Sequence, residues 1–289
     1  MTTYLLRRLI GTFPVLLLIS LLVFLLIQAA PGDPTLMLLG EEATAADIAE
    51  ARQRWGLNEP IYVQYLKFLT SATKGDFGES FKYDQPVIEV ITMRLPATIE
   101  LAAFSIVIAI VLALPLGVWA AARPNSWTDN IGTTFGLFGI SMPSFWLGIM
   151  LILLFAGIFN LFPSAGRDTY GVAGEPITGF YLLDSMVLQD WKAVRDALGH
   201  IFMPALALGA NMMGILMRVT RSSILDVMHE EYVVTARAKG LAEKKVLWRH
   251  VLSNALIPVV TVVGLELGTL LSGSIIVETV FAWPGSGSL

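Results

Sequence analysis

The side chains that could carry acid–base, redox or metal chemistry are few in this sequence and far apart. The three histidines, His200, His229 and His250, share no short spacing, and the chain contains no cysteine. A glutamate follows His229, but Val233 stands where the H-E-x-x-H pattern of a zinc protease requires a second histidine. The absence of cysteine excludes disulfides, thiolate nucleophiles and cysteine-ligated metals. The sequence therefore predicts neither a catalytic site nor a metal site.

Glu266 is the carboxylate that most needs an explanation, because it lies near the middle of the apolar segment Ile257–Val277. A charge at the centre of a membrane helix costs about 2.5–3.5 kcal/mol even on insertion-based scales. We therefore expect Glu266 to face the interior of a helical bundle or a wet cavity. Two interpretations stay open: the side chain lines a substrate path, or it is a hydrogen-bonded packing residue that carries a proton.

The composition of the chain places it in a membrane. Of its 289 residues, 55% are hydrophobic and 15% are charged, whereas soluble domains contain about 25% charged residues. The basic residues lie at the borders of apolar segments, a pattern that does not fit nucleic-acid binding. No G-x-x-x-x-G-K-[ST] sequence occurs, so the energy for uphill transport has to come from another subunit.

Long apolar segments predict an all-α fold, a polytopic bundle of transmembrane helices. We expect five spans: Leu9–Ile27, Ile99–Ala122, Ile131–Phe159, Ile201–Met217 and Ile257–Val277. The arginine pair before the first span predicts a cytoplasmic N-terminus. From Arg218 to Arg249 there are seven basic and four acidic residues, which also places that stretch in the cytoplasm. The chain then divides into residues 1–30 with the first span, an external segment at 31–97, and a core at 98–289 with a cytoplasmic loop at 222–256.

Two spans carry features beyond hydrophobicity. Proline in a membrane helix removes a hydrogen bond and bends the helix, so Ser141 and Pro143 interrupt the third span. Because transporters use broken helices to shape binding sites, we treat both residues as candidates for pore lining, with simple packing as the alternative. In the fifth span, small residues that allow close helix approach recur at steps of four; these are Gly264, Gly268 and Ser272.

The external parts of the chain give weaker signals. We expect amphipathic helices over Glu41–Gly56 and Pro60–Thr70 on the outer surface, and a second external segment at residues 160–200. Glu100 lies close to the outer end of the second span, where we expect its carboxylate to reach water. Residues 281–289 are expected to form a short external end after the fifth span.

The stretch Glu230–Pro258 is polar and lies between two apolar segments. Glutamates open a helical pattern, the favourable sign for the positive end of a helix dipole. Gly240 follows Lys239, as expected where a helix ends in a left-handed residue. A second helical pattern begins at Ala242 and continues into the fifth span. The sequence thus predicts a short helix, a glycine turn and a second helix beside the membrane.

Several motifs together resemble one family of membrane proteins. EYVVTARAKGL followed by RHVLSNALIPVVT is similar to the cytoplasmic coupling loop of ABC importer permeases, in the branch that carries dipeptides, oligopeptides, glutathione or nickel. The general signature has a glutamate where Val234 stands and an earlier proline than Pro258, and both departures are usual in this branch. Further segments with the same resemblance are PGDP at Pro31–Pro34, GDFGESF at Gly75–Phe81, GISMPSFWLG at Gly139–Gly148, TRSS at Thr220–Ser223 and FAWPG at Phe281–Gly285.

The resemblance implies a permease subunit in a bacterial inner membrane that works with partner subunits. These are a second permease, two ATP-binding subunits that bind ATP and magnesium, and an extracytoplasmic solute-binding protein; the chain itself is expected to hold no cofactor. Permeases of this branch have six spans, so the sequence looks truncated before the last one. The residues implied in ATPase coupling are Glu231, Tyr232, Thr235, Ala236, Arg237, Ala238, Lys239 and Gly240.

Other interpretations are weaker but distinct. Membrane lipid is the alternative partner for the basic residues near the membrane, Arg221, Arg237, Lys239 and Lys245, and we favour lipid for the two lysines. An ion-coupled secondary transporter would carry several intramembrane charges and an internal repeat, but the spans show one clear charge and no repeat. An intramembrane enzyme would need paired polar groups at one depth. The same permease role for glutathione or nickel chelates also stays open.

Overall fold

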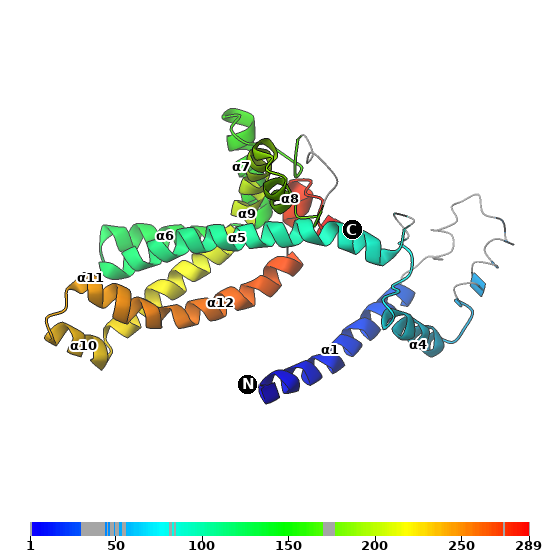
Figure 1. Cartoon of the computed structure of the whole chain (residues 1–289), viewed down its shortest axis with the longest axis horizontal. Helices are drawn as coiled ribbons and strands as arrows, with labels where there is room; N and C mark the ends of the chain where they lie inside the picture. Colours follow the sequence, from blue (N-terminus) through cyan, green and yellow to red (C-terminus); the bar gives the residue numbers. More distant parts are fainter. Residues whose placement is uncertain are drawn as a thin grey trace. The chain divides into compact units, whose positions relative to one another are not determined.

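The computed structural model is helical and consists of two compact units, Met1–Ile91 and Thr92–Leu289 (Figure 1). It describes residues 2–29, 56–80, 85–169, 177–273 and 275–288, with isolated positions 44, 46, 49, 52, 53 and 83. Within these residues the only β-type pairing is an isolated bridge between Glu79 and Pro86. The predicted all-α class is confirmed.

The described residues of the first unit include the helices α1 (Thr2–Ala29) and α4 (Ile61–Ala72). Residues Leu6–Ala29 of α1 are long and apolar enough to cross a membrane, which agrees with the predicted first span. The amphipathic helix expected at Pro60–Thr70 is present as α4. The PGDP motif and most of the helix expected at Glu41–Gly56 lie outside the described residues.

Helix α5 (Val87–Ala122) leads from the first unit into the second and starts well before the predicted span. At 1.5 Å per residue, its 36 residues extend about 54 Å, more than the roughly 30 Å of the hydrocarbon core. The apolar part therefore crosses the membrane and the first turns continue beyond it. Pro96 lies inside this helix and did not end it.

The predicted third span is broken rather than bent. It consists of α6 (Trp127–Ser141), α7 (Ser144–Leu151) and the π-helix η1 (Ile152–Ile158), and the two halves meet at 105°. Met142 has an extended backbone (φ −88°, ψ 129°) because a residue before proline avoids the helical region. Pro143 thus precedes the first turn of α7, where its missing N–H costs nothing.

Helix α9 (Trp191–Met228) is the centre of the second unit and contacts α6, α7, α8 (Tyr181–Val187) and α12. It crosses α6 at very short range, because a Cβ added to Gly139 would lie 2.6 Å from the carbonyl oxygen of Ala210. Glycine is required there for the two backbones to touch. Close packing through small residues therefore occurs between α6 and α9, a pairing that the sequence did not reveal.

The chain continues through a short turn into its last long helix. After α10 (Glu231–Ala238) come α11 (Glu243–Lys245), η2 (Val246–Val251) and α12 (Leu252–Gly273), and Glu243–Leu271 forms one further candidate span. In all, the described residues hold four helices that could cross a membrane, or five if the broken pair counts as one span.

The end of the described chain is not a free external segment, which corrects the expectation for residues 281–289. It consists of α13 (Ile275–Val280), a turn and η3 (Ser286–Ser288). Phe281 and Trp283 are buried, and the Trp283 indole donates a hydrogen bond of 3.0 Å to the carbonyl of Ala97 in α5. Two large aromatic side chains provide enough apolar surface to hold the segment against the bundle.

Candidate functional site

The short helix α10 ends in a Schellman motif at Gly240, as the sequence predicts. Gly240 has φ +76°, its N–H donates to the carbonyl of Arg237 at 2.9 Å, and the Leu241 N–H donates to that of Ala236 at 3.4 Å. This pair of bonds defines the motif, and Leu241 packs below the helix as its usual apolar partner. The chain reverses within two residues, so the end of α10 has a fixed direction.

One face of α10 is buried against the rest of the second unit. Val233 and Ala236 belong to a cluster that we call the basal cluster, which joins α5, α9, α10, η2 and α12. Its buried members are Ala121, Ile224, Val233, Ala236, Val246, Val251 and Ala255. The Tyr232 hydroxyl accepts a 2.9 Å hydrogen bond from Asn254 Nδ2, which adds a polar contact to α12. Helix α10 therefore packs in one cluster with one end of each of three long helices, α5, α9 and α12.

The opposite face of α10 projects from the molecule. It consists of residues at helical spacing that are exposed, namely Glu231, Val234, Thr235 and Ala238. Val234 is 55% exposed, an unusual position for an apolar side chain on a polar helix. Lys239 is also exposed, while Arg237 donates to Glu243 at 2.8 Å. We call the four residues the outward stripe.

Ala236, which the resemblance implies in ATPase coupling, does not lie on the outward stripe. Ala236 is 6% exposed and lies in the basal cluster, because it follows Val233 by three residues and shares its helix face. Val234, on which the outward stripe is centred, was not among the residues expected to couple to an ATP-binding subunit.

Arg221 and Asp129 connect α9 to the first turn of α6. The guanidinium donates from Nε to Oδ1 at 2.5 Å and from Nη2 to Oδ2 at 2.7 Å. The carboxylate also accepts the Asn125 N–H at 2.9 Å. Arg221 and Arg237, for which lipid was the alternative partner, form intramolecular ion pairs with Asp129 and Glu243 respectively. Asp129 was missed because its partner is distant in the sequence.

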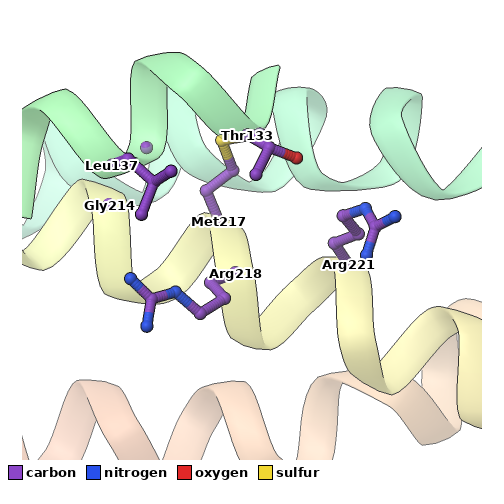
Figure 2. A pocket seen from close by; sticks show the side chains of 7 residues that line it. Thr133, Leu137, Gly214, Met217, Arg218 and Arg221 are labelled. Carbon is purple, nitrogen blue, oxygen red and sulfur yellow. The ribbon is translucent and has the colours of Figure 1, made fainter. Parts of the chain in front are cut away.

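A small cavity of about 60 Å³ lies beside this ion pair, between α6 and α9 (Figure 2). Figure 2 shows Met217 projecting from α9 toward α6, near Thr133. The cavity is lined by Thr133, Gly136, Leu137, Gly214, Met217, Arg218 and Arg221. Ligand pockets usually measure about 300–1,000 Å³, so this cavity has room for water but not for a peptide.

Glu266 lies on the inner face of α12. Val259 and Leu270, which recur with it at steps of four and seven, are buried, and Glu266 itself is half-buried. It has no hydrogen-bond or ion-pair partner among the described residues. Ser141 and Pro143 are exposed at the break between α6 and α7. Glu266 lies in α12, whereas Ser141 and Pro143 lie at the junction of α6 and α7. All three helices pack on α9, but the single chain does not form a closed site from these residues.

Asn211 of α9 is a polar residue that the sequence did not single out. Between Ile201 and Met217 nearly every side chain is buried, but Asn211 is exposed. Ile224 and Ala255 meet in the basal cluster, and from there Asn211 lies 13 residues back along α9 and Glu266 11 residues on along α12. At 1.5 Å per residue these distances are about 20 and 17 Å, so the two polar groups lie at nearly the same depth.

The predicted stripe of small residues on α12 is open in this chain. A Cβ added to Gly264 or Gly268 would meet no atom within 4 Å. The side chain of Ser272 is outside the described part of the structure. Close approach of another helix to this stripe stays a prediction, and the helix would not be one of those described here.

Away from the basal cluster, α5 takes part in a buried ion pair that hydropathy did not indicate. Glu100 was expected to reach water. Instead it is 7% exposed, and its carboxylate accepts hydrogen bonds from Arg167 Nη2 at 2.5 Å and from the Leu182 N–H at 2.8 Å. Arg167 also lies over the Tyr181 ring, 5.8 Å from its centre. Glu100 is buried because the segment that carries Arg167 and Leu182 folds back onto α5.

Asp184 in α8 organises the loop before it. Its carboxylate accepts the Thr178 hydroxyl at 2.6 Å and the N–H groups of Ile177, Thr178 and Gly179 at 3.0–3.2 Å. Burial alone would raise the pKa of Asp184, but these donors hold the pKa below its ordinary value of 3.8. The charged carboxylate of Asp184 thus holds residues 177–179 in place.

Glu278 is a second buried carboxylate that sequence analysis missed. It is fully buried, accepts the Thr98 hydroxyl at 2.7 Å and the Gly287 N–H at 2.7 Å, and so ties α13 and the final turn to α5. A Cβ at Gly285 would overlap this carboxylate, which explains the glycine of the FAWPG motif.

Comparison with known proteins agrees with this architecture. Residues 113–289 match the family described as binding-protein-dependent transport system inner membrane component, and residues 1–102 match its N-terminal membrane component. The chain belongs to this family of ABC importer permeases. As expected for such a permease, it is a multi-pass membrane protein and a transport subunit.

Curated relatives cover nearly the whole chain. The dipeptide transport system permease protein DppB of Alkalihalophilus pseudofirmus is 40% identical over 290 residues, which are 99% of this chain and 86% of the relative. The probable D,D-dipeptide permease DdpB of Escherichia coli is 39% identical, over 93% of this chain and 80% of the relative. The glutathione permease GsiC of Salmonella paratyphi A is 40% identical, over 100% and 85%.

Proposed function

We propose that this permease forms half of the translocation pore of an ATP-driven peptide importer. Its partners are a second, related permease, two cytoplasmic ATP-binding subunits that hold ATP and Mg²⁺, and an extracytoplasmic solute-binding protein. The N-terminus and α10 lie in the cytoplasm. Peptide cargo is supported by relatives named as dipeptide permeases, and glutathione, itself a small peptide, is the second candidate because GsiC is equally similar. Nickel chelates rest on the branch resemblance alone.

The observation that carries the proposal is the two-sided construction of α10. Its outward stripe, with Val234 at the centre, is available to a partner, while Val233 and Ala236 fix its inner face in the basal cluster. A displacement of α10 by an ATP-binding subunit therefore moves the attached ends of α5, α9 and α12 together. The Gly240 turn limits bending, so the motion reaches the spans rather than being absorbed in the loop.

Coupling residues follow from this geometry. Glu231, Thr235 and Ala238 accompany Val234 on the surface that meets the ATP-binding subunit, and Lys239 lies at its edge. Tyr232, Arg237 and Gly240 act from behind, because their hydrogen bonds hold the helix on Asn254, Glu243 and the turn. Lys245 is exposed on α11 and is assigned to lipid headgroups.

Glu266 and Asn211 are our candidates for the translocation path. Both are near the middle of their spans and at similar depth, and a lipid-facing polar group at that depth is costly. A water-containing path between the two permease halves gives them a hydrated environment. Ser141 and Pro143, at the exposed break of the third span, are further candidates.

Val234 offers a direct test of the coupling surface. Val234→Glu places a charge at an exposed position, so we expect normal membrane abundance. Burying that charge in an interface without a partner costs several kcal/mol, so recovery of the ATP-binding subunit with the tagged permease should fall about tenfold or more, and peptide uptake with it. Lys245→Ala is the matched control and should leave both unchanged. Normal recovery and uptake in Val234→Glu would refute the coupling role of α10.

A further inference from the structure

The first unit contains a helix whose contacts fix its depth in the membrane. Helix α4 packs on the second half of α1: the Tyr65 hydroxyl lies 2.9 Å from Ser20 Oγ and donates to the carbonyl of Leu17 at 3.1 Å. The rings of Phe24 and Tyr65 are 5.4 Å apart. Nearest the end of α1, the Gln28 amide donates to Gln64 at 2.8 Å.

The apolar run of α1 leaves no room for these contacts to lie in water. Leu9–Ile27 has nineteen residues without a charge, which extend about 28 Å as a helix, close to the roughly 30 Å of the hydrocarbon core. The whole run is therefore needed to cross the membrane. Ser20 lies seven residues before Ile27 and Leu17 lies ten, so the contacts of the Tyr65 hydroxyl are about 10–15 Å below the end of the run.

The surface of α4 is divided in a way that fits this depth. Tyr65 and Phe68 face α1. Away from α1, Tyr62 and Leu66 are 69% and 57% exposed, and no described residue covers them. Lys67, the single charged residue of α4, is on the other side and pairs with Glu59 at 2.7 Å. An apolar face, a polar face and a tyrosine are typical of a helix at a membrane interface.

We propose that α4 lies in the membrane interface at the end of α1, with Tyr62 and Leu66 among lipid acyl chains. The occupant of its exposed face is lipid, because the contacts to Ser20 and Phe24 place that face at the level of the acyl chains. The segment after the first span is thus partly a membrane-associated element rather than a wholly aqueous loop. This inference does not depend on the cargo or on ATP coupling.

The absence of cysteine from the chain allows a clean test with single-cysteine variants. Tyr62→Cys and Leu66→Cys are spin-labelled in the full chain, in vesicles of phosphatidylethanolamine and phosphatidylglycerol. Collision with oxygen, which concentrates in lipid, is compared with collision with a water-soluble nickel chelate. Leu18→Cys in the middle of α1 is the lipid control, and Lys67→Cys is the control on the polar face of α4.

If α4 lies in the interface, both labels should collide mainly with oxygen, at a depth of about 5–10 Å below the headgroups. The Lys67→Cys label should collide mainly with the nickel chelate. Labels at positions 62 and 66 that collide mainly with nickel would place α4 in water and overturn the proposal. Labels shielded from both reagents would also overturn it, since protein rather than lipid would then cover the face. Membrane abundance equal to that of the unsubstituted chain verifies insertion of each variant.

Discussion

Arg221 of α9 donates two parallel hydrogen bonds, of 2.5 and 2.7 Å, to Asp129 of α6, which lies 92 residues earlier in the sequence. Asp129 is 3% exposed, whereas the Arg221 side chain is 29% exposed and reaches the edge of the bundle. The two partners therefore differ in what happens when the other is removed. The pair lies at one end of the α6–α9 contact, near the basal cluster that carries α10.

Removing the arginine should harm the protein more than removing the aspartate. Arg221→Ala leaves a buried carboxylate without its counter-charge, and we expect a loss of about 3 kcal/mol. In Asp129→Ala the remaining guanidinium can turn to water, so the loss should be smaller. Thermal unfolding of the purified chain in detergent measures both. The double variant should be more stable than Arg221→Ala alone; equal or lower stability would show that the pair is unimportant.

Gly240→Val tests the turn after α10. A β-branched residue at φ +76° is strained by roughly 1–2 kcal/mol, and relief of that strain reorients α10. No atom lies within 4 Å of a Cβ at this position, so the effect comes from the backbone rather than from a clash. We expect normal insertion but reduced uptake and reduced retention of the ATP-binding subunit. Gly240→Asn, which tolerates positive φ better, should retain most activity; an equal loss in both variants would contradict the backbone explanation.

Glu266 should influence transport through its charge. Glu266→Gln keeps the size and polarity of the side chain, so we expect normal membrane abundance and altered uptake or an altered pH dependence of uptake. Glu266→Leu removes the polar group and should reduce uptake further. Leu265→Ala, at an exposed neighbour, is the control for general damage to α12. Unchanged uptake in Glu266→Leu would remove this residue from the path.

Asp184 should stabilise the external segment in a pH-dependent way. Because its pKa in the folded protein lies below 3.8, the stabilisation is complete above the unfolded value of about 3.9 and is lost as the pH falls through the folded value. Asp184→Asn should therefore be less stable than the parent chain at pH 7. The difference should shrink when thermal unfolding is measured at pH 3 and below. A difference that does not change with pH would exclude the charge as its cause.

Hydropathy and local turn chemistry were enough to predict several elements from the sequence. The spans in α1 and α12 follow because insertion free energy accumulates over about twenty consecutive residues, although the predicted span Ile257–Val277 ran past the end of α12 at Gly273 into α13. The left-handed conformation of Gly240 follows because it depends on the residue itself and on the helix that ends before it. Pro143 likewise indicated a break, since proline acts on its immediate neighbours.

The tertiary structure decided which side of each element meets which neighbour. The burial of Ala236 and the exposure of Val234 depend on how α10 lies on α9 and η2, and α10 carries apolar residues on both faces. Glu100 and Arg167 are 67 residues apart, and their pairing requires the external segment to fold back. Such contacts are not encoded in a local pattern, because they arise only when packing brings distant helices together and burial makes an unpaired charge costly.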